Sequence, residues 1–310
     1  MSLKKVAIIG ANGFIGKHLT RSLINNKSLD ITLFGRSETC EFSNQLPYHQ
    51  LDLKDTNYIA KYFKDTELVY YLASDSIPSS SWENPKFEVE QNLSPFINFL
   101  EFTCKLGLKK IVFVSSAGTI YGSSNEKLTE ESDKKPFSPY GITKLAMENY
   151  LNYFEAKFGL KYDIFRVSNV YGIGQDTSKG LGIINTFLEK ILSENSITIY
   201  GDGTNIRNYI YVTDVAELLK LSTSNEINES HIFNLASDDT LSINALIDFI
   251  KSIGVTNFRI NYQETRQSDN PAILVDNTKI KKTYKEFKFT PISEGLSKTY
   301  TYLKEKQKSN

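Results

Sequence analysis

The sequence predicts an α/β fold in which a doubly wound parallel sheet is joined to a smaller mixed lobe. Short apolar runs recur along the first half and alternate with segments of helical spacing, as expected of buried parallel strands connected by helices. A glycine-rich turn directly follows the first run. After residue 172 the alternation breaks, which indicates a differently built second part.

The first strand covers residues 6–9 and leads into glycines spaced G-x-x-G-x-x-G. The first glycine permits a tight turn, the second lets backbone approach a pyrophosphate, and the third lets the helix pack closely. The free N–H groups and positive dipole of that helix favour phosphate. We therefore expect a Rossmann-type dinucleotide site at Gly10, Asn12, Gly13, Phe14, Ile15 and Gly16. An ordinary strand-to-helix turn with incidental glycines is the alternative.

The second strand, residues 31–34, ends in Gly35-Arg36, where an acidic residue would bind the adenosine ribose of NAD. A glycine leaves room for a 2′-phosphate, and an arginine can pair with it bidentately. This pattern favours NADP slightly over NAD, the alternative being a solvated arginine. Further cofactor contacts are expected after the third and fourth strands, at Asp52, Leu53, Leu72 and Ala73.

The fifth strand, residues 109–116, ends in a small, hydroxyl-rich loop that reaches residue 122. Ligands of open α/β sheets gather at the carboxyl ends of the strands, so this loop should face the cofactor. We expect Ser115 at the cofactor and a hydroxyl of Ser116 or Thr119 on the oxygen of a substrate. The polar segment 125–139 is expected to be a surface excursion.

Tyr140 and Lys144 are four residues apart near the start of a predicted helix, and so lie on one face. A tyrosine, with a pKa of about 10, is a poor acid–base catalyst alone. A neighbouring ammonium stabilises tyrosinate and lowers that pKa, and it can also hydrogen-bond the nicotinamide ribose. The pair predicts alcohol–ketone interconversion, in which the tyrosine moves the proton and the cofactor the hydride. A surface helix pair is the alternative.

We divide the chain into a dinucleotide-binding domain over residues 1–168, with a return segment at about 208–236, and a substrate-binding lobe over 169–207 and 237–310. Lys plus Arg and Asp plus Glu both number 36 in 310 residues, which indicates neither nucleic acid nor membrane as a partner. Two cysteines make no disulfide framework, and three unclustered histidines predict no metal site. With no signal peptide expected, the default is a soluble cytoplasmic enzyme or binding protein.

The order of these motifs resembles the extended short-chain dehydrogenase/reductase superfamily, within its NAD-dependent epimerase/dehydratase family and close to UDP-glucose 4-epimerases. The resemblance covers nearly the whole chain and is carried by residues 10–16, 115–122, 140–144, 166–172, 199–203 and 207–216. It implies that Tyr140 and Lys144 are the catalytic pair. It also implies that Asn169, Arg207 and Arg266 bind a nucleotide-diphosphate sugar. A cation–π contact for Arg207 and a plain loop position for Arg266 are the alternatives.

Three departures from the family pattern matter. Ala117 stands where UDP-glucose 4-epimerases carry a substrate-binding Ser or Thr, which leaves Thr119 and Ser116 as the nearest candidates. Gly118 and Thr119 replace the Asp-Glu pair of the dehydratases, which disfavours 4,6-dehydration. Gly35-Arg36 replaces the acidic residue common in NAD-retaining epimerases.

The resulting prediction is a nucleotide-sugar 4-epimerase that oxidises and re-reduces the sugar C4 through bound NAD or NADP. The alternatives are an NADPH-dependent reductase of nucleotide-4-keto-6-deoxy sugars and a non-catalytic NADP-binding sensor. By analogy alone we expect a homodimer formed through the helices at 87–106 and 140–158. The alternative is that both apolar stripes serve only the core of the monomer.

Overall fold

The computed structural model describes residues 3–124, 126–178, 180–223, 228–265 and 272–309. The chain forms two compact units. The first comprises Met1–Ile120, Lys134–Arg166 and Ala216–Phe233, and the second comprises Tyr121–Asp133, Val167–Val215 and Asn234–Asn310. Residues 121–133 thus belong to the second unit, although the sequence division assigns them to the first domain. That the one unit serves the cofactor and the other the substrate stays a prediction.

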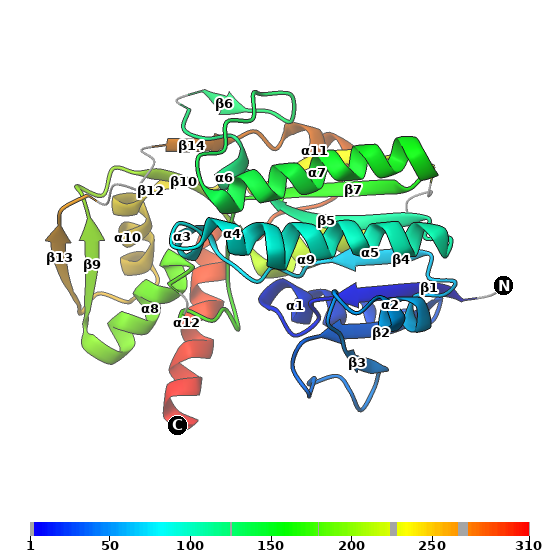
Figure 1. The fold of residues 1–310 in the computed structure, drawn as a ribbon. Helices are drawn as coiled ribbons and strands as arrows, with labels where there is room; N and C mark the ends of the chain where they lie inside the picture. Colours follow the sequence, from blue (N-terminus) through cyan, green and yellow to red (C-terminus); the bar gives the residue numbers. More distant parts are fainter. Residues whose placement is uncertain (1–2, 125, 179, 224–227, 266–271, 310) are drawn as a thin grey trace. The chain divides into compact units, whose positions relative to one another are not determined.

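The first unit is built on a seven-stranded sheet in the order β11-β7-β5-β4-β1-β2-β3 (Figure 1). Its strands are β1 (Lys4–Ile9), β2 (Leu29–Gly35), β3 (Tyr48–Gln50), β4 (Leu68–Tyr71), β5 (Lys110–Ser116), β7 (Lys161–Val167) and β11 (His231–Leu235). β1 runs parallel to both β2 and β4, β4 runs parallel to β5, and β2 to β3. The predicted doubly wound α/β fold is confirmed.

Helices cover both faces of this sheet, which explains why its central strands are apolar throughout. On one face, α2 (Thr56–Tyr62), α5 (Ser94–Lys105) and α7 (Pro139–Phe158) pack on a core that includes Ala7 and Ile9 of β1 (Figure 1). Toward the other face, the Tyr70 hydroxyl donates a hydrogen bond of 3.1 Å to the Leu219 carbonyl of α9 (Val212–Leu221). None of the helices in the described part of the chain is long and apolar enough to cross a membrane.

The predicted single helix over residues 87–106 is divided in the structure. A short α4 (Pro85–Phe87) leads into the π-helical segment η1 (Glu88–Leu93), and α5 then begins at Ser94. Pro95 has no N–H, so it cannot donate the α-helical hydrogen bond to the residue four positions earlier. A wider π-helical segment just before the proline is consistent with that loss.

The second unit contains a five-stranded sheet in the order β12-β10-β14-β6, with β8 also paired to β10, and a separate pair β13-β9. The strands are β6 (Lys127–Leu128), β8 (Asn169–Tyr171), β9 (Ser196–Tyr200), β10 (Ile206–Tyr211), β12 (Thr240–Ser242), β13 (Arg259–Gln263) and β14 (Ala272–Val275). The helices α8 (Ile183–Glu194), α10 (Ile243–Ser252) and α12 (Ile292–Ser309) share one apolar core, and α11 (Thr278–Thr283) follows β14.

The prediction that residues 125–139 form a surface excursion is wrong for part of this segment. β6 pairs in parallel with β14. Glu130 is only 7% exposed, and its carboxylate accepts a 2.7 Å hydrogen bond from the backbone N–H of Asn234. Backbone pairing with a distant strand and a buried carboxylate hold this segment in place. It therefore needs no apolar stripe, and its polar sequence does not reveal that it is held.

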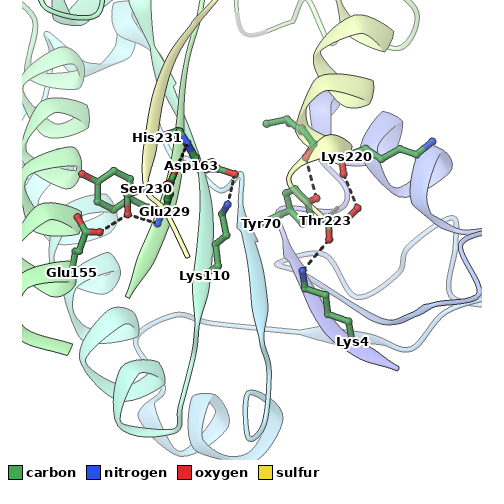
Figure 2. A network of polar contacts seen from close by, with 12 residues as sticks. Lys4, Tyr70, Lys110, Glu155, Asp163, Lys220, Thr223, Glu229, Ser230 and His231 are labelled. Atoms are coloured by element: carbon green, nitrogen blue, oxygen red, sulfur yellow. Dashed lines mark hydrogen bonds and ion pairs between the residues drawn. The ribbon is translucent and has the colours of Figure 1, made fainter. Parts of the chain in front are cut away.

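A buried polar network lies toward the amino ends of the strands of the first sheet (Figure 2). Lys110, the first residue of β5, forms a 2.8 Å ion pair with Asp163 of β7, and neither side chain is exposed. The Nδ1 atom of His231 lies 3.2 Å from the other oxygen of Asp163. Since ligands collect at the carboxyl ends of such strands, this network is a structural feature of the edge opposite the glycine turn.

Candidate active site

The turn after β1 requires glycine at two positions. Gly10 has a positive φ of +90°, and a Cβ there would lie 3.0 Å from the backbone nitrogen of Ala73. A Cβ on Gly16 would lie 2.1 Å from the Gly10 carbonyl oxygen. The turn therefore packs directly on the backbone of Leu72 and Ala73, two residues that the sequence predicts at the cofactor.

The helix that follows begins with its backbone donors open. α1 (Phe14–Leu23) has Gly13 as its N-cap, and no side chain caps it. The first N–H groups of a helix have no partner within the helix and attract anions. Phe14 and Ile15 are therefore suited to hold the diphosphate of a dinucleotide, whereas the Gly13 N–H already donates to the Gly10 carbonyl at 2.9 Å. The close-packed turn before them presents backbone rather than side chains to such a ligand.

The end of β2 differs from its sequence-based interpretation. A Cβ on Gly35 would lie 2.9 Å from the Tyr48 hydroxyl, and the Asn12 Nδ2 donates to that same hydroxyl at 3.2 Å. The space beside Gly35 that the sequence reserves for a phosphate thus contains a phenol ring. Arg36 forms a 2.9 Å ion pair with Asp75, which follows β4.

Two further predicted cofactor residues follow β3. Asp52 is exposed, and its Oδ1 accepts a 2.9 Å hydrogen bond from the Lys54 backbone. Leu53 packs partly buried against the core of the first unit. Their predicted contact with the adenine stays a prediction.

Tyr140 and Lys144 lie at the start of α7. Ser138 caps this helix by accepting a 3.1 Å hydrogen bond from the Gly141 N–H. The Lys144 Nζ donates a 3.2 Å hydrogen bond to the Val114 carbonyl of β5 and lies 5.6 Å from the centroid of the Tyr140 ring. The structure therefore brings the pair together at the carboxyl end of β5.

Burial shifts both groups of the pair. It raises the pKa of Tyr140 to about 12, the negative charge of Glu88 adds to the increase, and a hydrogen bond with Ser74 opposes it. Burial lowers the pKa of Lys144 to about 8, against the opposing charges of Glu88 and Glu148. The lowered tyrosine pKa expected from the sequence is thus wrong for the protein alone, because desolvation outweighs the effect of the lysine.

The hydroxyl-rich loop after β5 forms a single helical turn, α6 (Ala117–Ile120). Thr119 is 9% exposed, and its buried hydroxyl has no hydrogen-bond partner among the described residues. A Cβ on Gly141 would lie 2.4 Å from the Thr119 carbonyl oxygen, so α6 contacts the start of α7. Ser116 is half-buried, whereas the Ser115 hydroxyl donates a 2.5 Å hydrogen bond to Glu148.

Two buried polar residues of η1 are not among the site residues predicted from the sequence. Glu88 is 1% exposed and Asn92 is 7% exposed, and the Asn92 amide donates a 3.1 Å hydrogen bond to Glu88. Polar residues in a helix are ordinarily assigned to its solvent face. Their spacing of four, continued by the buried Phe96, was the available signal that both residues point inward.

The second unit holds the predicted substrate ligands. The Asn169 amide donates a 2.9 Å hydrogen bond to the Asn208 carbonyl, and β8 and β10 are paired so that Asn169 lies opposite Tyr209. Arg207, one residue before Asn208, donates to the Ile206 carbonyl at 2.8 Å. Asn169 and Arg207 are therefore neighbours within this unit. Arg266 lies outside the described residues.

Comparison with known proteins gives consistent matches over the whole chain. The model of the NAD dependent epimerase/dehydratase family matches residues 6–236. A Methanocaldococcus jannaschii protein assigned to the UDP-glucose 4-epimerases is 34% identical over 310 residues, covering 96% of this chain and 98% of the relative. The dTDP-4-dehydro-6-deoxyglucose reductase of Escherichia coli is 29% identical over 306 residues, covering 94% and 95%.

Solved structures agree with these relatives. The UDP-glucose 4-epimerase of Thermotoga maritima with UDP-glucose has a TM-score of 0.90 at 28% identity, with 98% of this chain and 99% of that chain covered. The Thermus thermophilus UDP-glucose 4-epimerase in complex with NAD has a TM-score of 0.87 at 26% identity, with 96% and 98% covered.

Proposed function

The chain belongs to the NAD-dependent epimerase/dehydratase family, and from that membership we propose that it is a nucleotide-sugar 4-epimerase. The observation that carries the proposal is the arrangement within the first unit. A tyrosine–lysine pair lies at the carboxyl end of β5, next to α6, whose Thr119 hydroxyl is buried and has no hydrogen-bond partner among the residues that the structure describes. In the same sheet, the glycine turn after β1 leaves open backbone donors for a dinucleotide.

An NAD held by the backbone of the glycine turn would supply the acceptor, and then the donor, of the hydride at C4 of the sugar. Tyr140 accepts the proton of the C4 hydroxyl and gives it back. Its pKa of about 12 must fall for this step, and two positive charges, Lys144 and an oxidised nicotinamide, would both favour tyrosinate. Thr119, or Ser116 beside it, orients the oxygen that reacts.

The substrate class follows from the second unit and the relatives. Arg207 can pair with a diphosphate, and the neighbouring Asn169 can donate to its oxygens or to the sugar. Arg266 is kept as a further ligand on sequence grounds. Since the similar solved structures bind UDP-glucose or act on it, we propose a UDP-sugar.

For the cofactor we propose NAD. The sequence favours NADP slightly because Gly35 leaves room for a 2′-phosphate and Arg36 can pair with it. In the structure, Tyr48 fills that room and Asp75 already pairs with the arginine. An NAD-binding neighbour of 26% identity is in agreement.

A 4-keto-sugar reductase is the second candidate, favoured by the 29% identity to the Escherichia coli reductase. Purified protein incubated with UDP-glucose and no added cofactor separates the two. An epimerase forms UDP-galactose and consumes no reductant. A reductase leaves UDP-glucose unchanged and oxidises NADPH only when a 4-keto sugar is supplied. A sensor binds the dinucleotide and turns over neither substrate.

Two further proposals concern the state of the protein. Exposed apolar side chains on η1 and α7, Val89, Tyr153 and Phe158, favour a homodimer through these helices. A monomeric mass in solution would exclude it. Cys40 and Cys104 are free thiols, which agrees with a cytoplasmic, reducing location.

A further inference from the structure

Glu88 is a buried acidic residue that the proposed mechanism does not use. It is 1% exposed and is the first residue of η1. Its Oε2 accepts a 3.1 Å hydrogen bond from the Asn92 amide, whereas its buried Oε1 has no hydrogen-bond partner among the described residues. Burying a carboxylate is costly unless it is paired or hydrogen-bonded. Positive charge nearby would compensate that cost.

Lys144 is the cation on which the charge of Glu88 acts. η1 packs against α7, and the negative charge of Glu88 acts on both Lys144 and Tyr140, raising the pKa of each. Glu148 also acts on Lys144, but Arg166 already pairs with it at 2.7 Å. In the described part of the chain, no arginine pairs with Glu88.

Two ion pairs at the surface account for Glu90 of η1 and for Glu101 of α5. Lys86 of α4 lies 3.0 Å from Glu90, and on α5 Lys105 lies 2.9 Å from Glu101. Among the carboxylates of η1 and α5, Glu88 is the one whose charge acts on both Tyr140 and Lys144.

Asn92 holds the Glu88 carboxylate in place. Its amide nitrogen also donates to the Ser76 hydroxyl at 3.1 Å, and its amide oxygen accepts from the Asp75 backbone N–H at 2.9 Å. Asn92 thus ties η1 to the loop after β4, close to the glycine turn. π-helical segments are frequent at functional sites, where they redirect a side chain.

We propose that Glu88 is a positioning residue for the catalytic pair, whose buried carboxylate is the counter-charge that keeps the Lys144 ammonium protonated beside Tyr140. The assignment rests on the proposed function in that it takes Tyr140 and Lys144 as the reacting pair. Without Glu88, only Glu148, which Arg166 already pairs, opposes the effect of burial on Lys144, so Lys144 loses its proton at lower pH. The negative charge that raises the pKa of Tyr140 is removed by the same change, so the pKa of the tyrosine falls as well.

The first test uses the protein without substrate. The absorbance of tyrosinate is titrated in wild type and Glu88→Gln, each measured against the same protein carrying Tyr140→Phe, so that the difference reports Tyr140 alone. Glu88→Gln removes the charge and keeps the shape, and should lower the pKa of Tyr140 by about one unit. The matched control Glu90→Gln makes the same chemical change on the exposed side of η1 and should leave the difference titration unchanged.

The second test is the pH profile of kcat/KM for UDP-glucose epimerisation. The charge of Glu88 raises the pKa of both groups, so Glu88→Gln should move the whole profile to lower pH by about one unit. Glu88→Asp keeps the charge and should keep the wild-type position of the profile, even if the rate falls. A purely structural role would lower the rate and leave the profile in place.

The inference is overturned if Glu88→Gln folds with an unshifted Tyr140 titration, or if Glu88→Asp shifts the profile as far as a charge loss would. Should Glu88→Gln not fold, Glu88→Met, which also removes the charge at similar size, replaces it in both measurements, with the same shifts expected. A protein that shows the Tyr140 shift but no epimerisation supports the charge role of Glu88 and refutes the 4-epimerase, so the two failures are distinguishable.

Discussion

Asp75 lies 2.9 Å from the guanidinium of Arg36, so the arginine at the end of β2 is paired with a residue from the loop after β4. Arg36 is 69% exposed and Asp75 22% exposed. A 2′-phosphate at this point would have to displace the carboxylate or accept its repulsion. If the adenosine ribose lies here, as proposed, the pair acts against NADP at a position where the sequence alone favours it.

Asp75→Asn should raise the affinity for NADP relative to NAD. Because an exposed ion pair contributes about 0.2–1 kcal/mol, the change in the ratio of Kd values should be about 1.4- to 5-fold. Calorimetric titration with both dinucleotides measures it. Asp65→Asn, which removes a comparable exposed pair with Lys5, is the control and should leave the ratio unchanged. An unchanged ratio in Asp75→Asn as well would remove Asp75 from the account of cofactor choice.

Thr119→Val should separate activity from stability. The valine is nearly isosteric and removes a buried hydroxyl that has no partner in the described structure, so stability should be unchanged or about 1 kcal/mol higher. Turnover should fall about 10- to 100-fold if this hydroxyl orients the reacting oxygen. Urea unfolding and steady-state kinetics measure the two effects. Ser116→Ala is the comparison: a larger loss there would make Ser116 the residue that replaces the hydroxyl absent at Ala117.

Local patterns allowed much of this structure to be predicted. The strand, glycine turn and helix at residues 6–23 are specified by neighbours in sequence, as is the placement of Tyr140 and Lys144 on one helix face. Features made by distant segments were not predictable. Tyr48 reaches the space beside Gly35 because β3 pairs with β2, with Leu33 opposite Tyr48. No local pattern contains that pairing.

The same limit applies to β6 and Glu88. β6 is two residues long and exists through its pairing with β14, more than a hundred residues away in sequence. Glu88 and Asn92 are polar residues, which are ordinarily expected at the surface. In the structure they point inward, because η1 packs on α7 and Asn92 is hydrogen-bonded to the loop after β4. The direction of the Tyr140 pKa shift likewise depended on burial, which sequence does not reveal.

Lys110→Met should destabilise the protein strongly. It leaves Asp163 buried without its ammonium partner, and breaking a buried pair in this way costs about 3–5 kcal/mol. Replacing both residues, as Lys110→Met with Asp163→Leu, should restore most of that stability. Guanidinium unfolding measures both. A loss below about 1 kcal/mol for the single variant would show that His231, 3.2 Å from Asp163, is a sufficient partner.

Activity should fall as pH rises through about 8, the pKa to which burial lowers Lys144. The deprotonated amine no longer favours tyrosinate, so the loss lies on the alkaline side.

The contribution of Lys144 to the free energy of unfolding has the opposite dependence on pH. Between pH 8 and 10.5 the unfolded chain holds a proton that the folded one does not, so stability rises with pH in that window. Rate and unfolding profiles across it measure both signs. Lys144→Met should abolish the stability slope from this group. A slope that persists unchanged would contradict the assignment.

The central claim is that Tyr140 and a held dinucleotide oxidise and re-reduce one sugar carbon. The most direct measurement follows UDP-glucose that carries deuterium at C4, incubated with the purified protein and no added cofactor. The account predicts UDP-galactose that retains the deuterium at C4, and a loss of about 10²- to 10⁴-fold in rate for Tyr140→Phe, with Tyr153→Phe on the same helix unaffected. Product in which the deuterium has exchanged with solvent, or full turnover by Tyr140→Phe, would contradict it.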